Sequence, residues 1–362
     1  MDSITQAVLG AAVAVAVLPV ARAKRAAIYG AVIGTLPDLD ALIHFANPVD
    51  SFVYHRSATH SLLVLSVFAP MLWWLLRRFD KALHADSNRW LLACWLVLIT
   101  HPLLDWFTNY GTQLFWPIVD TPYALSSVFI VDPIYTLPLL LASALAWRSR
   151  GTITRQRARH YCVVALVFSQ AYLGWTLVAQ HWIRSRVLTA ESANLNAVIG
   201  ADVAVYAAPF TSLLYRVLIK EKGAQPALDY YRESYVSVFA DLNSQPIWRD
   251  IPRYNSKANL TWASPEVIAQ LHALPDFQRL ARFSQGYYGV TLTTDQTLVL
   301  SDLRMGGEPT YVFNFALARL QPGGVLQAQA TQQLPGRRPD LRAVAWLFRR
   351  IYTPAEVLPQ IH

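Results

Sequence analysis

Apolar residues in the first half of the chain gather in six runs that short polar stretches separate. The runs cover residues 7–21, 26–37, 62–76, 90–104, 133–147 and 161–180. Only the last run reaches the roughly 20 residues that span a bilayer, and each of the others taken alone fits a buried helix equally well. Their close succession predicts an all-α helical membrane bundle of about six hydrophobic helices.

The second half of the chain has a different pattern. Residues 288–305 alternate apolar and polar positions on both sides of a polar turn, which predicts a β-hairpin. Residues 212–221 and 310–320 are also typical of strands. A short helix over 264–274 begins with Ser264 as its cap. These elements predict an α+β domain.

Composition changes where the pattern changes. Hydrophobic residues make up 54% of the sequence and charged residues 15%, against about a quarter charged in soluble domains. The first glutamate is Glu191. We therefore expect a membrane-embedded domain over residues 1–182 and a soluble domain over 183–362. Cys94 and Cys162 lie in apolar runs, so we interpret them as core residues and not as a disulfide or metal pair.

Cationic residues predict the orientation in the membrane. The stretches 21–25, 77–89 and 148–159 together hold twelve Lys and Arg, whereas 38–60 and 105–132 hold one. Because cationic loops stay in the cytoplasm, the last two stretches and the C-terminal domain should be extracytoplasmic, in a multi-pass protein of a bacterial inner membrane. The net charge of +8 thus reflects topology, and we expect no nucleic-acid partner.

Acidic and imidazole side chains collect on the side that the charges predict to be extracytoplasmic. They come from three stretches, "GTLPDLD" after the second run, "HRSATHS" before the third and "THPLLDW" at the end of the fourth. The candidate metal ligands are Asp38, Asp40, His55, His60, His101 and Asp105. His101 and Asp105 are four residues apart, which places them on one face of a helix.

Imidazole and carboxylate together suit Zn²⁺, Mn²⁺ or Fe²⁺. Six ligands exceed what one tetrahedral zinc needs, so two or more ions are expected, with zinc as the first choice. Each motif alone also has a structural interpretation. The His-x-x-x-Asp pair fits a helix-surface contact, "PDLD" fits a helix end, and Ser57, Thr59 or Ser61 could cap the next helix.

Other polar residues near these motifs are candidates for binding. Arg56 is the one cation of the predicted outer stretches and could hold an anionic substrate such as a phosphate. Residues that could line a pocket or support the ligands are Asn109, Tyr110, Gln113, His44 and Asp132. For Asp132, which opens the fifth run, helix capping is an equally good interpretation.

Five motifs together resemble the YdjM-like family of membrane-bound metal-dependent hydrolases, over about residues 1–180. They are "MDSITQAVLGAAV", "GTLPDLD", "HRSATHS", "THPLLDWFTNYGTQLFWP" and "VFIVDPIYTLP". The C-terminal half is similar to an extension found in longer members. The resemblance implies a helical fold distantly similar to zinc-dependent phospholipase C and P1 nuclease, and it implies the same six metal ligands. Many relatives have Thr-His where this chain has Thr5-Gln6. Gln6 offers only a neutral amide, for which Asp2 or the terminal amine could compensate.

These observations favour an integral-membrane hydrolase that acts on a phosphoester, small-molecule or lipid, at the extracytoplasmic surface in contact with membrane lipid. Asp38, Asp105 or a nearby carboxylate would take the proton from the attacking water, and Arg56 would hold the substrate. Two alternatives remain: a transporter or metal-handling protein, and a non-enzymatic scaffold with a structural metal site. The grouping of acids on one side argues against a conduction path, which needs ionisable groups at several depths.

Overall fold

The computed structural model describes the chain except residues 192–201, 242–245, 258–261, 337–340 and 354–362. The chain forms two compact units. The N-terminal unit contains residues 1–43, 54–178 and 209–211, and the C-terminal unit contains 44–53, 179–208 and 212–362. The predicted border at residue 182 is close to the observed change of unit after Val178, but each unit also includes a segment from the other half of the sequence.

All six apolar runs become helices. They are α1 (Ser3–Val17), α2 (Ala23–Thr35), α4 (Leu62–Phe79), α5 (Ser87–Trp106), α6 (Pro133–Arg148) and α7 (Thr152–Glu191). By length and composition, two helices of the described chain, α4 and α7, could cross a membrane. The prediction of about six membrane helices is therefore not confirmed.

The physical reason lies in length and in end composition. Helices α1, α2 and α6 have 15, 13 and 16 residues, which at about 1.5 Å per residue fall short of the roughly 30 Å hydrocarbon layer. Helix α5 has 20 residues, but it begins with Ser-Asn-Arg and carries His101 and Asp105 in its last turns.

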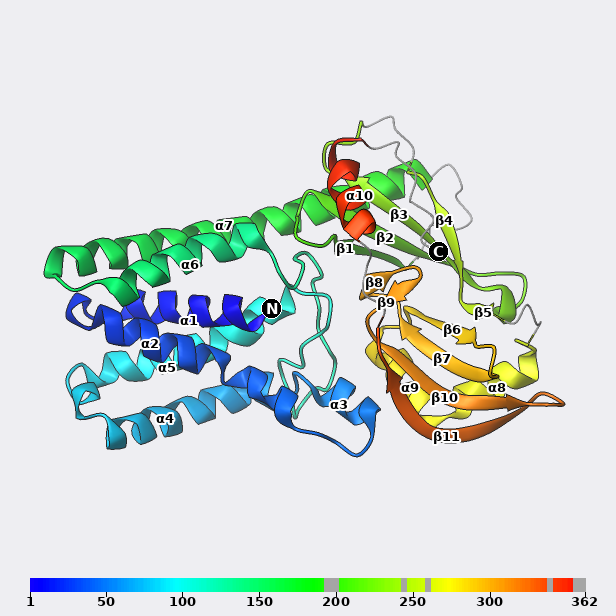
Figure 1. Ribbon diagram of the computed structural model, residues 1–362, viewed down its shortest axis with the longest axis horizontal. Coiled ribbons are helices and arrows are strands. Elements are labelled where there is room, and N and C mark those ends of the chain that lie inside the picture. Colours follow the sequence, from blue (N-terminus) through cyan, green and yellow to red (C-terminus); the bar gives the residue numbers. More distant parts are fainter. Residues whose placement is uncertain (192–201, 242–245, 258–261, 337–340, 354–362) are drawn as a thin grey trace. The chain divides into compact units, whose positions relative to one another are not determined.

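Helix α1 packs against α2, α5 and α6, and Figure 1 shows α1 and α2 side by side. Gly10 and Gly30 make this packing close, because a Cβ atom added at Gly10 would lie 2.3 Å from the Gly30 carbonyl oxygen. This approach holds the carboxyl end of α2, and the polar stretch after it, against the start of α1.

The C-terminal unit contains two main sheets. The first is antiparallel, in the order β1 (Val203–Ala207), β2 (Leu214–Glu221), β3 (Tyr230–Ser237) and β4 (Arg249–Pro252). The second has the order β11 (Val325–Leu334), β10 (Asn314–Gln321), β7 (Thr297–Asp302), β6 (Tyr288–Leu292) and β5 (Tyr254–Ser256), and only the pair β5–β6 is parallel. A short hairpin joins β8 (Gly306–Gly307) to β9 (Thr310–Tyr311).

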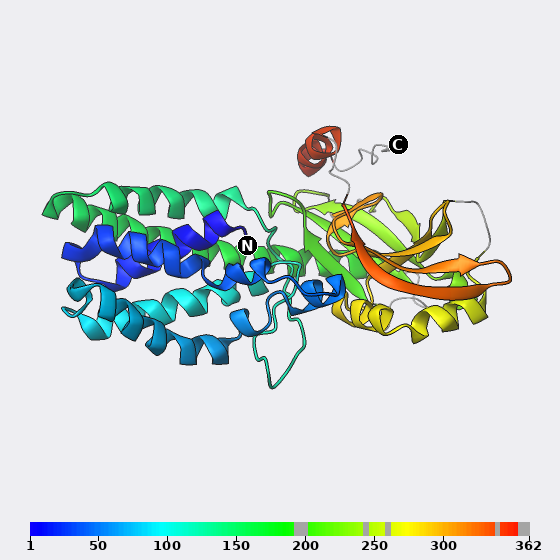
Figure 2. The same cartoon turned by 60° about the horizontal axis from the view of Figure 1, so that its bottom comes forward.

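Helices α8 (Pro265–Ala273), α9 (Pro275–Phe283) and α10 (Leu341–Tyr352) pack on the strands of this unit. Helices α8 and α9 cover one face of the five-stranded sheet (Figures 1 and 2), where Phe277 of α9 packs on Tyr288 of β6. Helix α10 packs on β2 and β3. The predicted hairpin is confirmed as β6–β7, and Ser264 caps α8 as expected.

Candidate metal centre

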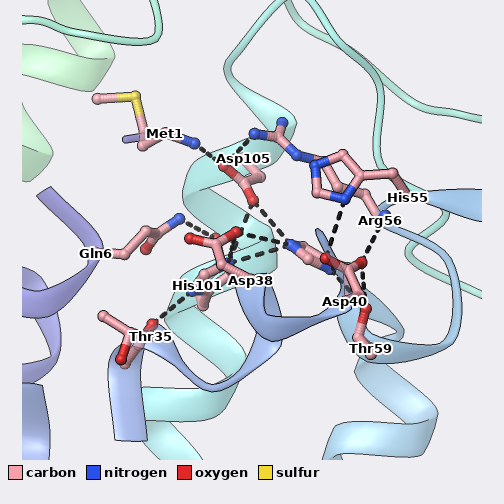
Figure 3. A network of polar contacts seen from close by, with 12 residues as sticks. Met1, Gln6, Thr35, Asp38, Asp40, His55, Arg56, Thr59, His101 and Asp105 are labelled. Carbon is pink, nitrogen blue, oxygen red and sulfur yellow. Dashed lines mark hydrogen bonds and ion pairs between the residues drawn. The ribbon is translucent and has the colours of Figure 1, made fainter. Parts of the chain in front are cut away.

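Four side chains of the N-terminal unit converge on one point (Figure 3). Asp38, His60, His101 and Asp105 each offer one ligand atom, and these atoms lie within 4.8 Å of one another. Figure 3 labels Asp38, His101 and Asp105 among them. His60 Nε2 lies 3.1 Å from His101 Nε2, 3.2 Å from Asp105 Oδ2 and 3.6 Å from Asp38 Oδ1. His101 Nε2 lies 3.3 Å from Asp38 Oδ1 and 3.4 Å from Asp105 Oδ2.

Each ligand takes its place from a local feature of the sequence. Pro37 follows α2 and opens the 3₁₀-helix η2 (Pro37–Leu42), which carries Asp38. His60 ends the 3₁₀-helix η3 (Ala58–His60), directly before Ser61, whose hydroxyl caps α4. His101 and Asp105 lie one turn apart on α5, as their spacing predicts.

Hydrogen bonds behind the imidazoles place a proton on the Nδ1 atom of each ring. His101 Nδ1 lies 2.7 Å from the Gly34 carbonyl oxygen, which can only accept, so Nδ1 carries the proton. His60 Nδ1 lies 3.0 Å from Thr59 Oγ1, and the Thr59 hydroxyl donates its own hydrogen to Asp40 Oδ2 at 2.7 Å. In the neutral rings, both Nε2 atoms therefore present lone pairs to the centre.

The cluster fits a divalent ion. In a tetrahedral site with bonds of about 2.0–2.1 Å, the ligand atoms are about 3.3–3.4 Å apart. Five of the six distances among the four ligand atoms run from 3.1 to 3.6 Å, and all six are within 4.8 Å. Asp38 Oδ2 and Asp105 Oδ2 are buried atoms without a hydrogen bond. An arrangement of acceptors alone is satisfied by a cation, which these four residues could hold.

Asp40 and His55 lie beside this cluster. Asp40 accepts hydrogen bonds from Thr59 and from the Arg56 backbone N–H, and its Oδ1 lies 3.0 Å from His55 Nδ1. Burial opposes ionisation of Asp40, but the contacts of His55, His60 and the Arg56 N–H lower its pKa to about 2. Direct coordination by Asp40 and His55, and the second ion that it would require, stay predictions. The contacts of Asp40 instead place it behind His60.

Charge around the cluster favours ionised carboxylates. Burial alone would raise the pKa of Asp38, yet its contacts with His101 and His60 hold that pKa well below its usual range. Asp105 Oδ1 forms ion pairs with the Met1 ammonium and with Arg56 Nη2, the latter at 3.3 Å. The side chains of His60, His101 and Asp105 are 0–1% exposed and that of Asp38 is 17% exposed, so solvent reaches the cluster on the Asp38 side.

The surroundings of Arg56 differ from those expected of a residue that holds a substrate anion. Its guanidinium is buried, donates to Thr108 Oγ1 at 3.0 Å and lies over the Tyr110 ring at 5.1 Å. Its backbone is left-handed, with φ of 63°. Arg56 thus holds the Asp105 side chain, and binding of a substrate anion stays a prediction.

The other residues that were predicted to line a pocket or support the ligands lie in different environments. Tyr110 packs edge-on against His55, Gln113 bonds the Arg56 carbonyl through its backbone N–H, and Asn109 Oδ1 is buried without a hydrogen bond. Gln6 donates to the His101 carbonyl at 3.2 Å. His44 belongs to the C-terminal unit.

Asp2 and Asp132 are helix caps. Asp2 accepts from the N–H groups of Ile4 and Thr5, and Asp132 accepts from those of Ile134 and Tyr135. Asp132 also accepts the Tyr172 hydroxyl at 2.7 Å. The sequence interpretation missed the Gly34 carbonyl and the Thr108 hydroxyl, and no spacing or motif marks a backbone acceptor.

The N-terminal part of the chain matches a known protein family. Residues 1–183 match the family model described as YdjM inner membrane protein. The uncharacterized protein YfhP of Bacillus subtilis (strain 168) is 31% identical over 162 residues, which cover 42% of this chain and 48% of that protein. The match thus spans about half the length of this relative. No solved structure matches the chain.

Proposed function

The chain belongs to the YdjM inner membrane protein family, and on that premise we propose that it is an integral-membrane, metal-dependent hydrolase. Its substrate class would be phosphoesters, including lipid ones, and its site would open to the extracytoplasmic side. The alternating distribution of cationic residues supports this orientation, with twelve Lys and Arg in three loops and one, Arg56, in the two others.

One observation carries the proposal. Two imidazole Nε2 atoms, which are acceptors when both rings are neutral, and two carboxylate oxygens face one another in a buried place, with five of their six distances at 3.1–3.6 Å. Buried acceptors without donors cost free energy unless a cation satisfies them. Residues from three sequence-distant elements meet here, and ordinary helix packing needs none of them.

The residues have separable roles in this reaction class. A divalent ion held by Asp38, His60, His101 and Asp105 would supply a Lewis acid and make nearby water acidic near neutral pH. Asp38 is the ligand on the solvent side, and its depressed pKa keeps the carboxylate ionised, which is the state that a cation binds. Arg56 holds Asp105, and Gly34, Thr59 and Asp40 hold the two imidazoles.

The test is metal content and phosphodiester hydrolysis of the full chain, purified in detergent. Bis-p-nitrophenyl phosphate and mixed phospholipid micelles serve as probes. We expect stoichiometric metal and chelator-sensitive turnover in the wild type, and neither in a His60→Ala, His101→Ala double variant. His84→Ala changes an exposed histidine distant in sequence from the ligands and should match the wild type. Metal in the double variant would refute the site.

A structural metal site is the second candidate, because four protein ligands saturate a tetrahedral ion and three of them are inaccessible. The visible spectrum of Co²⁺-loaded protein separates the two. A spectrum of higher coordination that changes on adding phosphate indicates an open position and supports hydrolysis. An intense four-coordinate spectrum that phosphate does not change, together with no turnover of either probe, supports the structural role.

A further inference from the structure

The chain between Asp40 and His55 forms a loop whose ends meet at the candidate metal centre. His55 Nδ1 lies 3.0 Å from Asp40 Oδ1, and the Arg56 N–H donates to Asp40 Oδ2 at 3.0 Å. The tip of this loop, residues 44–53, belongs to the C-terminal unit. Residues 44–53 therefore fold with the C-terminal unit, while the residues on both sides of them in the chain lie beside the candidate metal ligands.

Aromatic contacts of Phe52 fix the tip of the loop, residues 44–53, within the C-terminal unit. Phe52 of α3 (Pro48–Tyr54) is 4% exposed. Its ring centroid lies 4.7 Å from that of Phe283 at the end of α9, 4.7 Å from that of Phe313 and 5.1 Å from that of Phe315 on β10. The rings of Phe52, Phe283 and Phe315 are buried, so the tip of the loop is part of the packed interior of that unit.

Polar contacts fix the direction of the tip. Asn47 Nδ2 donates to both carboxylate oxygens of Asp276 at 3.1 Å, and the Thr331 hydroxyl of β11 donates to the same carboxylate at 2.6 Å. Arg279 of α9 forms an ion pair with Asp50. Two residues of one face of α9, Asp276 and Arg279, therefore bind two positions of the loop.

The base of the loop contacts a metal ligand. Asp40 Oδ2 lies 3.6 Å from His60 Nδ1 and accepts the Thr59 hydroxyl, which in turn contacts His60 Nδ1 at 3.0 Å. Groups of this kind set the tautomer and the orientation of a ligating imidazole. A displacement of the tip that moved Asp40 would therefore turn the His60 ring.

We propose that the C-terminal unit positions the metal ligand His60 by seating residues 44–53, and that Phe52, Asp50 and Arg279 are positioning residues of the centre. This inference rests on the proposed metal site, but not on the reaction that the site performs. The C-terminal half thereby has a defined role: its fold sets the geometry, and hence the affinity, of a site built entirely from the N-terminal unit.

The experiment measures Co²⁺ and Zn²⁺ affinity by chelator competition, and the visible spectrum of the Co²⁺ form, on the full chain in detergent. Phe52→Ala removes the aromatic anchor. Arg279→Asp sets a carboxylate against Asp50 and Asp276, and the double exchange Asp50→Arg, Arg279→Asp restores an opposite pair. We expect about tenfold weaker binding and an altered Co²⁺ spectrum in the two single variants, with recovery in the exchange.

Two controls match these changes within the same unit. Leu271→Ala truncates a fully buried side chain of α8. Arg319→Asp removes the exposed ion pair between Arg319 of β10 and Asp295. Both should keep wild-type affinity and spectrum. If Phe52→Ala does not fold, the Arg279 variant and its exchange decide alone.

The possible results distinguish failure of the metal site from failure of the positioning role. A wild type that binds neither metal refutes the metal centre itself. A wild type that binds, with unchanged affinity and spectrum in Phe52→Ala and Arg279→Asp, refutes the positioning role and leaves the centre standing. Equal weakening in the controls would show a general loss of stability and would also overturn the inference.

Discussion

The Nε2 atoms of His60 and His101 face each other at 3.1 Å, although the opposite nitrogen of each ring is the one that donates a hydrogen bond. Gly34 and Thr59 accept those bonds. Two lone pairs directed at each other, with two carboxylate oxygens beside them, repel unless positive charge lies between them. This pair of rings therefore makes the cluster a candidate site for a cation.

Removal of one imidazole should reduce metal affinity strongly. For His101→Ala we expect a loss of more than about 100-fold, above the 10–100-fold range of groups that only support a ligand. Asp40→Asn should stay within that range, because Asp40 lies behind His60. Chelator-competition titrations of the two variants check the order, and a larger loss for Asp40→Asn would indicate that Asp40 binds the ion directly.

Arg56→Met should destabilise the protein and make its stability depend on metal. The change leaves buried Asp105 without one of its counter-charges, and loss of one partner of a buried pair costs about 3–5 kcal/mol. The Met1 ammonium remains on Asp105, so the lower end of this range is expected. Thermal unfolding with and without Zn²⁺ should show a larger metal-induced rise in Tm than in the wild type. An equal rise in both would contradict the role of Arg56 as a partner of Asp105.

Gly10→Ala should destabilise the helical unit. Its Cβ would meet the Gly30 carbonyl oxygen at 2.3 Å, and backbone atoms cannot rotate away, so we expect a loss of about 1–3 kcal/mol. Gly174→Ala in α7 is the matched control, because nothing lies within 4 Å of its added Cβ. That control should be neutral or gain about 0.5–1 kcal/mol. Thermal unfolding in detergent distinguishes the two variants.

Glu308→Gln should stabilise the C-terminal unit at neutral pH. Burial raises the pKa of Glu308, and Arg249 offsets this only in part. A raised carboxyl pKa means that the folded state binds the proton more tightly than the unfolded state. The wild type therefore loses stability as pH rises from the ordinary glutamate range through the raised pKa. Denaturant unfolding at pH 4 and pH 8 should give the variant a higher free energy of unfolding than the wild type at pH 8 and a similar one at pH 4. A less stable variant at pH 8 would contradict this assignment.

The predicted orientation can be tested with single cysteines. His84 and Asp295 are exposed positions, one in a cationic stretch and one in the C-terminal unit. Native Cys94 and Cys162 are buried. A membrane-impermeant maleimide applied to intact spheroplasts should label Asp295→Cys at once and His84→Cys only after lysis. The reverse order of labelling would place the C-terminal unit in the cytoplasm.

Much of the local structure follows from the sequence. Each of the six apolar runs becomes a helix, in which the backbone hydrogen bonds are made within the segment. Ser61 and Ser264 cap the helices that follow them, and the alternation over 288–305 gives the β6–β7 hairpin. The prediction of about six membrane helices is not confirmed, because runs of about 15 residues satisfy the composition of a span without its length, and only α4 and α7 of the described chain meet both criteria.

The sequence by itself determined which residue types and motifs could bind a metal, because imidazole and carboxylate are rare in apolar runs. Only the tertiary structure decided that Asp38, His60, His101 and Asp105 converge while Asp40 and His55 lie behind them. It also decided that residues 44–53 fold with the C-terminal unit. These outcomes depend on helix packing at Gly10 and Gly30 and on a backbone carbonyl at Gly34. Contacts of this kind join residues far apart in the chain, and local periodicity carries no record of them.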